Sequence, residues 1–143
     1  RRAELRTFMY EVRVEAKFEA GHKRGPDGEI HSLHHHAWKV AAYARSDDLD
    51  HIGLVIDFRV LRTVVDEVLG MLDQRVLEDV EGFSESGPTV PAVAAWIFER
   101  LDGRMRTITG GENGTEPDGT HDFWLAAVEV EADPGIRFEY RLD

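Results

Sequence analysis

The chain has 143 residues, of which 42% are hydrophobic and 31% are charged. A chain of this length buries most of its apolar surface in one core, so we expect a single domain over residues 1–143. The formal net charge of −11, without a cluster of Lys or Arg, excludes nucleic acid and membrane surfaces as expected partners, and no apolar run approaches the roughly 18 residues of a membrane span. The absence of cysteine excludes disulfides, thiolate metal ligands and thiol nucleophiles, and it fits a reducing cytoplasm, where we expect the protein to act.

Alternation of apolar and polar residues predicts two antiparallel strands in the first third of the chain. The first runs from Tyr10 to Ala20, with its apolar side chains at every second position. Turn-forming residues fill positions 23–28, and the alternation resumes from His34 to Ala44. The second strand is therefore expected to pair with the first.

Two amphipathic helices are predicted next. The first follows Asp57, a suitable N-cap, and has apolar residues three and four positions apart until it ends near Asp73. The second opens at Pro88-Thr89 and is expected to end at Asp102-Gly103.

The last third of the chain predicts a mobile surface segment and a hairpin. Residues 109–120 are rich in Gly, Glu, Asn and Pro and show no apolar periodicity. Alternation returns over 124–131 and 136–142, with the turn formers Asp133-Pro134-Gly135 between them. The element order ββααββ predicts an α+β domain, a four-stranded antiparallel sheet with two helices on one face, whose open edges favour assembly.

A cluster of histidines is the strongest chemical signal. His34 and His36 are two apart on a predicted strand, so their side chains leave the same face with Cα atoms about 7 Å apart. His22 lies just beyond the predicted end of the partner strand. Three neutral imidazoles with a fourth position open to water are typical of a catalytic zinc site.

The pattern also fits a histidine-rich hairpin whose imidazoles only form hydrogen bonds. His35 is expected on the other face of the sheet, as a surface or interface residue. His51 and His121 have no partner at ligand spacing, which favours a surface role for both.

Several short motifs resemble those of the 6-pyruvoyl-tetrahydropterin synthase family. Phe18-Glu19-Ala20-Gly21-His22 and His34-His35-His36-Ala37-Trp38 are similar to its F-x-A-A-H and H-G-H-x-Y/W elements. Further matches follow in the family's order over almost the whole chain, namely Ile56-Asp57-Phe58 with Leu61, Leu72-Asp73, Pro88-Thr89, and Val128 to Glu131 with Tyr140.

This resemblance implies a tunnelling fold, in which sheets join edge to edge into an oligomeric barrel, usually two trimers stacked as a hexamer. It implies that His22, His34 and His36 hold zinc. It also implies that Glu131 anchors the edge of a pterin ring, with Thr89 beside it, since a carboxylate can accept paired N–H donors.

The chain departs from the family pattern at three places. The family's base is a cysteine four to six residues before the H-x-H pair, a window that here reads Gly28-Glu29-Ile30. Its Asp-His proton relay reads Asp73-Gln74, which keeps a candidate catalytic carboxylate but replaces a titrating imidazole by an amide. Pro91 stands where the family usually has a glutamate. Ordinary synthase activity is therefore not expected.

Three functions stay open from the sequence. The first is a homologue that binds a pterin-like heterocycle, with Gln74 orienting it, but has lost or changed the family reaction. The second is an active zinc-dependent lyase that uses Glu29 or His31 as its base, although both residues also read as ordinary loop positions. The third is a non-enzymatic oligomer that recruits a partner protein.

Overall fold

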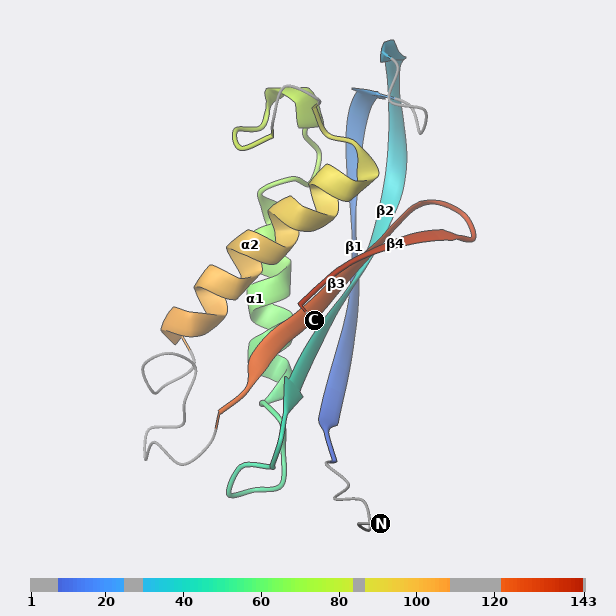
Figure 1. Ribbon diagram of the computed structural model, residues 1–143. Helices are drawn as coiled ribbons and strands as arrows, with labels where there is room; N and C mark the ends of the chain where they lie inside the picture. The colour runs from blue at the N-terminus through green and yellow to red at the C-terminus, as the bar shows by residue number, and fades with distance from the viewer. Residues whose placement is uncertain (1–7, 25–29, 84–86, 109–121, 143) are drawn as a thin grey trace.

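The computed structural model describes residues 8–24, 30–83, 87–108 and 122–142, which form a sheet layer and a helix layer (Figure 1). The strands are β1 (Tyr10–Arg24), β2 (Ile30–Ser46), β3 (Trp124–Asp133) and β4 (Ile136–Arg141). The helices are α1 (Phe58–Gly70) and α2 (Val90–Ile108), with a short 3-10 turn, η1 (Leu77–Asp79), between them. The strands are antiparallel neighbours in the order β1-β2-β3-β4, and α1 and α2 lie on one side of the sheet. The predicted α+β architecture is confirmed.

The β1–β2 hairpin is longer than the alternation predicted. Its pairing is regular from Tyr10 opposite Ser46 to His22 opposite His34 and includes Arg24 opposite Ile30 beyond a register shift, so His22 lies within β1 and not beyond its end. Even-numbered positions such as Phe18 and Trp38 are buried against the helices, whereas most odd-numbered positions are exposed. The sheet therefore has a helix-facing side and an open side, and the parity of a residue decides which side it occupies.

Helix α1 begins where the sequence predicted. The Asp57 carboxylate accepts a hydrogen bond from the Arg59 backbone N–H at 2.9 Å, which satisfies one of the free N–H groups of the first turn. The apolar stripe of α1 is fully buried in the core and consists of Leu61, Val64, Val65 and Val68. The helix ends at Gly70, earlier than Asp73, because the following residues turn to run along β1.

Helix α2 continues past the expected stop at Gly103. Met105 is 3% exposed and belongs to the core, so packing beyond the glycine outweighs its helix cost of about 1 kcal/mol. Within the described part of the chain, neither helix is of the length and apolarity that membrane crossing takes. The segment 109–120 lies outside the described residues.

Candidate metal and ligand site

Three histidines meet on the helix-facing side of the β1–β2 hairpin. His22 is paired with His34, and His36 is paired with Ala20, so the three imidazoles project from neighbouring positions of two strands. Their ring centroids lie 4.5 Å apart for His22 and His34, 4.8 Å for His22 and His36, and 4.7 Å for His34 and His36. The cluster predicted from the H-x-H pattern and a distant histidine is therefore present as a geometric unit.

The spacing of this cluster suits one metal ion. One nitrogen from each ring lies within 4.8 Å of the others. A tetrahedral zinc ion with bonds of about 2.0–2.1 Å needs nitrogens about 3.3 Å apart, a contraction that side-chain rotation can supply. The cluster offers three ligands and leaves a fourth position for a water molecule or a substrate oxygen.

Burial makes His22 the most constrained of the three. It is 4% exposed, and neither Nδ1 nor Nε2 has a hydrogen-bond partner among the described residues. Burial lowers the pKa of His22 to about 4, the neighbouring imidazoles of His36 and His34 lower it further, and the carboxylates of Glu78 and Asp133 oppose this shift. A buried polar group without a partner costs about 1–3 kcal/mol. A neutral, unpartnered imidazole of this kind is the form that binds a metal ion.

His34 and His36, both half-buried, complete the cluster. The Nδ1–H of His34 donates to the Ser32 carbonyl at 2.9 Å, since a carbonyl can only accept. This hydrogen bond leaves the Nε2 lone pair of His34 available as a ligand, and it orients the ring as outer partners of metal ligands do. Burial and the neighbouring His34 lower the pKa of His36.

Trp38 forms the floor of the cluster. It is fully buried, stacks on Phe18 at 5.7 Å, and meets the ring of His22 at 5.2 Å and that of His36 at 6.2 Å. Its indole thus separates the imidazoles from the apolar core beneath them and restricts their rotation.

Residues 73–76 run beside the same end of β1. Oδ1 of Asp73 accepts the Glu19 backbone N–H at 2.9 Å, and the Gln74 backbone N–H donates to the Glu19 carbonyl at 2.6 Å. The Gly21 N–H then donates to the Arg75 carbonyl at 2.9 Å. Asp73 and Gln74 are therefore held against the strand that carries His22, with both side chains exposed.

The backbone of Gln74 has a left-handed conformation, with φ at +63°. Among residues other than glycine, Asn, Asp and His are enriched in this region. The backbone conformation of the turn after α1 thus sets the direction in which the Gln74 side chain leaves the main chain, whatever residue stands there. Its amide can donate and accept hydrogen bonds but does not titrate.

Two carboxylates near the histidines were not predicted from the sequence. Glu78, on η1, accepts the Lys23 backbone N–H at 2.9 Å, and Asp133 is the last residue of β3. The charges of both act on His22, and that of Asp133 also acts on His36. The sequence indicates Asp133 only as a turn former before Pro134-Gly135, because its place on the sheet depends on the strand register.

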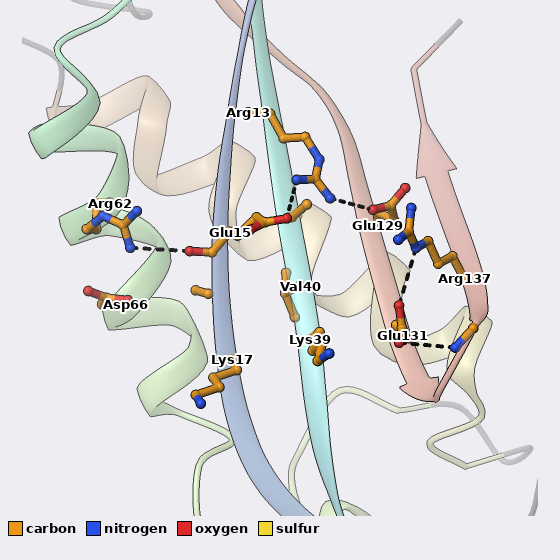
Figure 2. A pocket seen from close by; sticks show the side chains of 13 residues that line it. Arg13, Glu15, Lys17, Lys39, Val40, Arg62, Asp66, Glu129, Glu131 and Arg137 are labelled. Atoms are coloured by element: carbon orange, nitrogen blue, oxygen red, sulfur yellow. Dashed lines mark hydrogen bonds and ion pairs between the residues drawn. The ribbon is translucent and has the colours of Figure 1, made fainter.

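Glu131 lies on the opposite, open side of the sheet. Its register partners are Lys39 and Arg137, its carboxylate pairs with Arg137 at 3.3 Å, and it accepts the Gly135 N–H at 3.2 Å (Figure 2). The Gly135 hydrogen bond and then Arg137 lower the pKa of Glu131. Within one chain, the structure does not bring Glu131 to the histidines.

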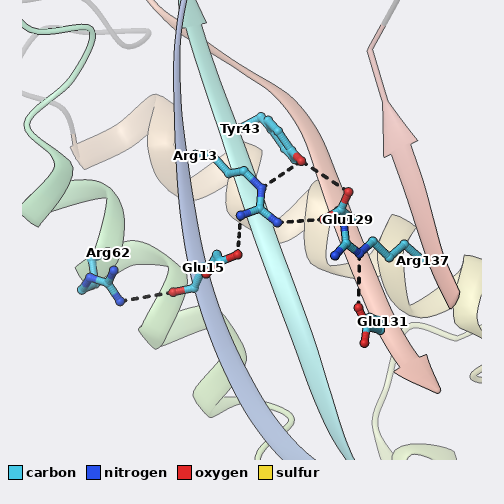
Figure 3. A network of polar contacts seen from close by, with 7 residues as sticks. All are labelled: Arg13, Glu15, Tyr43, Arg62, Glu129, Glu131 and Arg137. Atoms are coloured by element: carbon cyan, nitrogen blue, oxygen red, sulfur yellow. Dashed lines mark hydrogen bonds and ion pairs between the residues drawn. The ribbon is translucent and has the colours of Figure 1, made fainter. Parts of the chain in front are cut away.

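The open side carries a network of charged groups around a hollow of about 720 Å³. Arg13 is its centre, pairing with Glu15 and, at 3.0 Å, with Glu129, while its Nε donates to the Tyr43 hydroxyl at 2.9 Å (Figure 3). These contacts engage most of the donors of Arg13, so the network is largely satisfied within the chain.

The remaining predicted site residues are not gathered at the cluster. Thr89 acts as a cap of α2, where its Oγ1 accepts the Ala92 N–H at 3.3 Å. His51 is an exposed residue of the segment before α1. Glu29 and His121 lie outside the described residues, and His31 lies in β2 with its side chain outside them.

Comparison with known proteins shows that a family model matches most of this chain. The family model described as 6-pyruvoyl tetrahydropterin synthase matches residues 11–141. A 6-carboxy-5,6,7,8-tetrahydropterin synthase from Synechocystis sp. is 35% identical over 100 residues, which cover 66% of this chain and 76% of the relative.

Solved structures share the fold at low sequence identity. The 6-pyruvoyl tetrahydropterin synthase of Caenorhabditis elegans has a TM-score of 0.71 at 22% identity and covers 97% of this chain and 99% of its own. The Plasmodium vivax 6-pyruvoyltetrahydropterin synthase, solved with a glutamate replaced by alanine and described as a catalytic residue mutant, has a TM-score of 0.70 at 17% identity over 95% and 99% of the two chains.

Proposed function

Because the chain belongs to the 6-pyruvoyl tetrahydropterin synthase family, we propose that it binds a pterin-like heterocycle beside a zinc ion held by His22, His34 and His36. The observation that carries this proposal is the buried His22, whose two ring nitrogens have no partner among the described residues. Such a group is costly unless a ligand uses its lone pair. The neutral state of His22 and the orientation of His34 by Ser32 fit the same use.

The residues present fit zinc better than a hard cation, because imidazole nitrogens suit zinc whereas magnesium and calcium prefer oxygen ligands. When bound, zinc supplies Lewis-acid polarisation of a ligand oxygen at the open fourth position. The chain itself orients the His34 ring through the Ser32 carbonyl and restricts the His22 ring by contact with Trp38. The chemistry that follows depends on the proton-transfer groups near this position.

The proton-transfer groups of this chain favour a protein that binds the ligand but has lost or altered the family reaction. No cysteine is present to serve as the family's base. The Asp73 carboxylate is engaged by the Glu19 N–H, and the neighbouring Gln74 can position a ligand but cannot relay its proton. Loss of an acid–base group lowers the reaction rate about 10²–10⁴-fold, so turnover of the family substrate is expected to be slower by at least this factor.

The test is a fluorescence titration of dihydroneopterin into the zinc-loaded protein. Saturable binding at a stoichiometry of one per chain is expected, with a dissociation constant on the order of micromolar. An absence of saturation at high micromolar ligand, with zinc retained, would refute pterin binding while leaving the metal site standing.

A second candidate function is a zinc-dependent lyase with Glu29 as base, alone or with His31. The support for it comes from the Plasmodium vivax synthase, in which a glutamate is described as a catalytic residue. Glu29 falls in the window where the family usually has its cysteine. A glutamate can remove a proton if the ligand lies within hydrogen-bond reach of its carboxylate.

Incubation with dihydroneopterin triphosphate separates the two functions. If Glu29 is the base, wild type forms product and Glu29→Gln reduces the rate about 10²–10⁴-fold, with His31→Asn as the parallel variant and His51→Asn as the exposed control. Product formation that neither Glu29→Gln nor His31→Asn slows would rule out both residues as the base. Product yield is followed by liquid chromatography.

Assembly into a homo-oligomer, with six chains as the family resemblance implies, is part of the proposal. β1 and β4 are the outer strands of the sheet, and β4 exposes a row of apolar residues, Ile136, Phe138 and Tyr140, with Leu142 just beyond its end. Open edges and apolar rows of this kind are normally covered. Sedimentation equilibrium is expected to give about six times the chain mass of 16.2 kDa, and a monomer at micromolar concentration would contradict it.

A further inference from the structure

Two lysines stand directly opposite each other on the open side of the sheet. Lys17 of β1 and Lys39 of β2 are register partners, so their side chains leave the same side, with Cβ atoms about 4.5–5.5 Å apart (Figure 2). Both side chains are exposed, whereas the next register pair, Phe18 and Trp38, is buried on the other side. Like charges directly opposite each other on neighbouring strands destabilise a sheet. The pairing therefore costs stability unless a negative group lies between the two ammonium groups.

The carboxylates that the sheet places near the two lysines are engaged by arginines. Glu131, the register partner of Lys39 on β3, is held by Arg137 at 3.3 Å. Arg13 pairs with the other two carboxylates that the sheet contributes to the hollow, Glu15 and Glu129. Among the residues that the structure describes, no hydrogen bond or ion pair engages the ammonium group of Lys17 or of Lys39. The chain itself therefore does not neutralise this pair.

The two lysines line the hollow of about 720 Å³, to which α1 adds two charged groups (Figure 2). Arg62 donates through Nη1 to the Glu15 carbonyl at 3.2 Å, which leaves its charge uncompensated, and Asp66 lies one turn further along α1. Five cationic and four anionic side chains line the hollow, although the whole chain has a net charge of −11. Apart from the carboxylates held by arginines, the three cations face only Asp66. The hollow therefore has a local excess of positive charge.

This arrangement suits an anion that carries more than one negative charge and several oxygens. Two lysine side chains that leave neighbouring strands in parallel can donate to two oxygens of one phosphate group, at about 2.8 Å each. The guanidinium of Arg62 has donors beyond the one that the Glu15 carbonyl accepts. The volume of the hollow exceeds that of a single phosphate group and is in the range of pockets for small organic ligands, about 300–1,000 Å³.

We propose that Lys17 and Lys39, with Arg62 beside them, bind a phosphate group on the open side of the sheet, either as free phosphate or as part of an organic phosphate. The bound anion neutralises the pair of like charges and so removes the cost of their direct opposition. The site lies across the sheet from the histidine cluster, which is on the helix-facing side. The inference therefore goes beyond the proposed function and does not depend on it.

Isothermal titration calorimetry of inorganic phosphate into the zinc-loaded, assembled protein tests the proposal. Saturable binding is expected with a dissociation constant on the order of 0.1 mM. Lys17→Gln and Lys39→Gln are each expected to weaken binding about tenfold, because each removes one charge-assisted hydrogen bond. The double variant is expected to show no saturation at millimolar phosphate. Lys23→Gln is the matched control, since it removes the same charge from β1 outside the hollow, and it is expected to stay within about twofold of wild type.

A parallel titration of adenosine monophosphate separates the two sources of a phosphate group. Equal affinity for both anions would identify the phosphate group alone as the part that is bound. An affinity for the nucleotide at least about tenfold higher, lost in the double variant, would identify an organic phosphate whose remaining atoms fill the hollow.

Thermal unfolding provides a second readout that does not rely on calorimetry. A phosphate concentration of about 10 mM is expected to raise the Tm of wild type and of Lys23→Gln much more than that of the double variant, because a ligand of the folded state stabilises it. In phosphate-free buffer the double variant is expected to be at least as stable as wild type, since the pair of like charges has been removed.

Undiminished phosphate binding by the double variant would overturn the proposal, because the anion would then lie at the zinc ion or elsewhere. No binding of phosphate or nucleotide by wild type would also overturn it. Dissociation of the assembly in Lys17→Gln, seen by sedimentation, would contradict it in a third way, since a second copy would then supply the negative group. The pterin titration of wild type is a separate measurement, so failure here is distinguishable from failure of the proposed function.

Discussion

A His22→Leu variant is expected to lose zinc while it keeps its fold. Structural zinc sites release about 10–16 kcal/mol over four ligands, or about 2.5–4 kcal/mol each, so removal of one imidazole is expected to weaken zinc binding by about two to three orders of magnitude. Leucine has a similar volume and no polar atoms. It therefore fills the site on the Trp38 ring edge and removes the two unpartnered nitrogens of the buried imidazole.

The matched control is His35→Leu. His35 lies on the same hairpin between two cluster residues, but it is exposed on the open side of the sheet. Zinc content, measured after purification without chelator, is expected to be about one per chain for wild type and His35→Leu and near zero for His22→Leu. Equal zinc content in wild type and His22→Leu would remove His22 from the metal site.

Urea unfolding of the two variants without metal gives a second readout. Metal-free His22→Leu is expected to be at least as stable as metal-free wild type, by about 0–3 kcal/mol, because a buried polar group without partners has been replaced by an apolar one. A large loss of stability would mean that the imidazole nitrogens have protein partners in solution.

The metal-free wild-type protein is expected to lose stability as the pH falls from 6.5 to 4. The pKa of His22 is about 4 in the folded chain, below the value of 6.5 for a free imidazole. Between these two values the unfolded chain binds the proton and the folded chain does not, so a lower pH favours unfolding. At about 1.36 kcal/mol per pKa unit, His22 contributes a loss of about 3 kcal/mol across this window.

Urea unfolding in the presence of chelator, at several pH values from 7.5 to 4.5, measures this effect. His36, whose pKa is also lowered, adds a loss of the same sign. The His22→Leu variant isolates the contribution of His22, since all other titrating groups stay in place. A pH dependence as steep in His22→Leu as in wild type would contradict the burial of a neutral imidazole at this position.

Alternation and helical spacing predicted the fold because each element buries one regular face. The strands could be recognised from the alternation after Tyr10 and after His34, and α1 from its stripe after Asp57. The end of α2 could not, because the burial of Met105 against the sheet, a tertiary effect, carries the helix through Gly103.

The histidine cluster was predictable for the same reason. Residues two apart on a strand share a side, so His34 and His36 had to project together, and the hairpin brings His22 opposite them. The place of Asp133 was not predictable, because a bulge leaves no mark in the alternation that precedes it. The same limit applies to Gln74, whose position next to β1 depends on how α1 ends.

The most direct test of the proposed function is one titration of dihydroneopterin into the protein with zinc and into the same protein after zinc removal. The proposed function predicts saturable binding of one ligand per chain with zinc, and binding at least about tenfold weaker without it, since the metal at His22, His34 and His36 supplies one contact to the ligand. Identical titration curves with and without zinc, or no saturation in either, would contradict it.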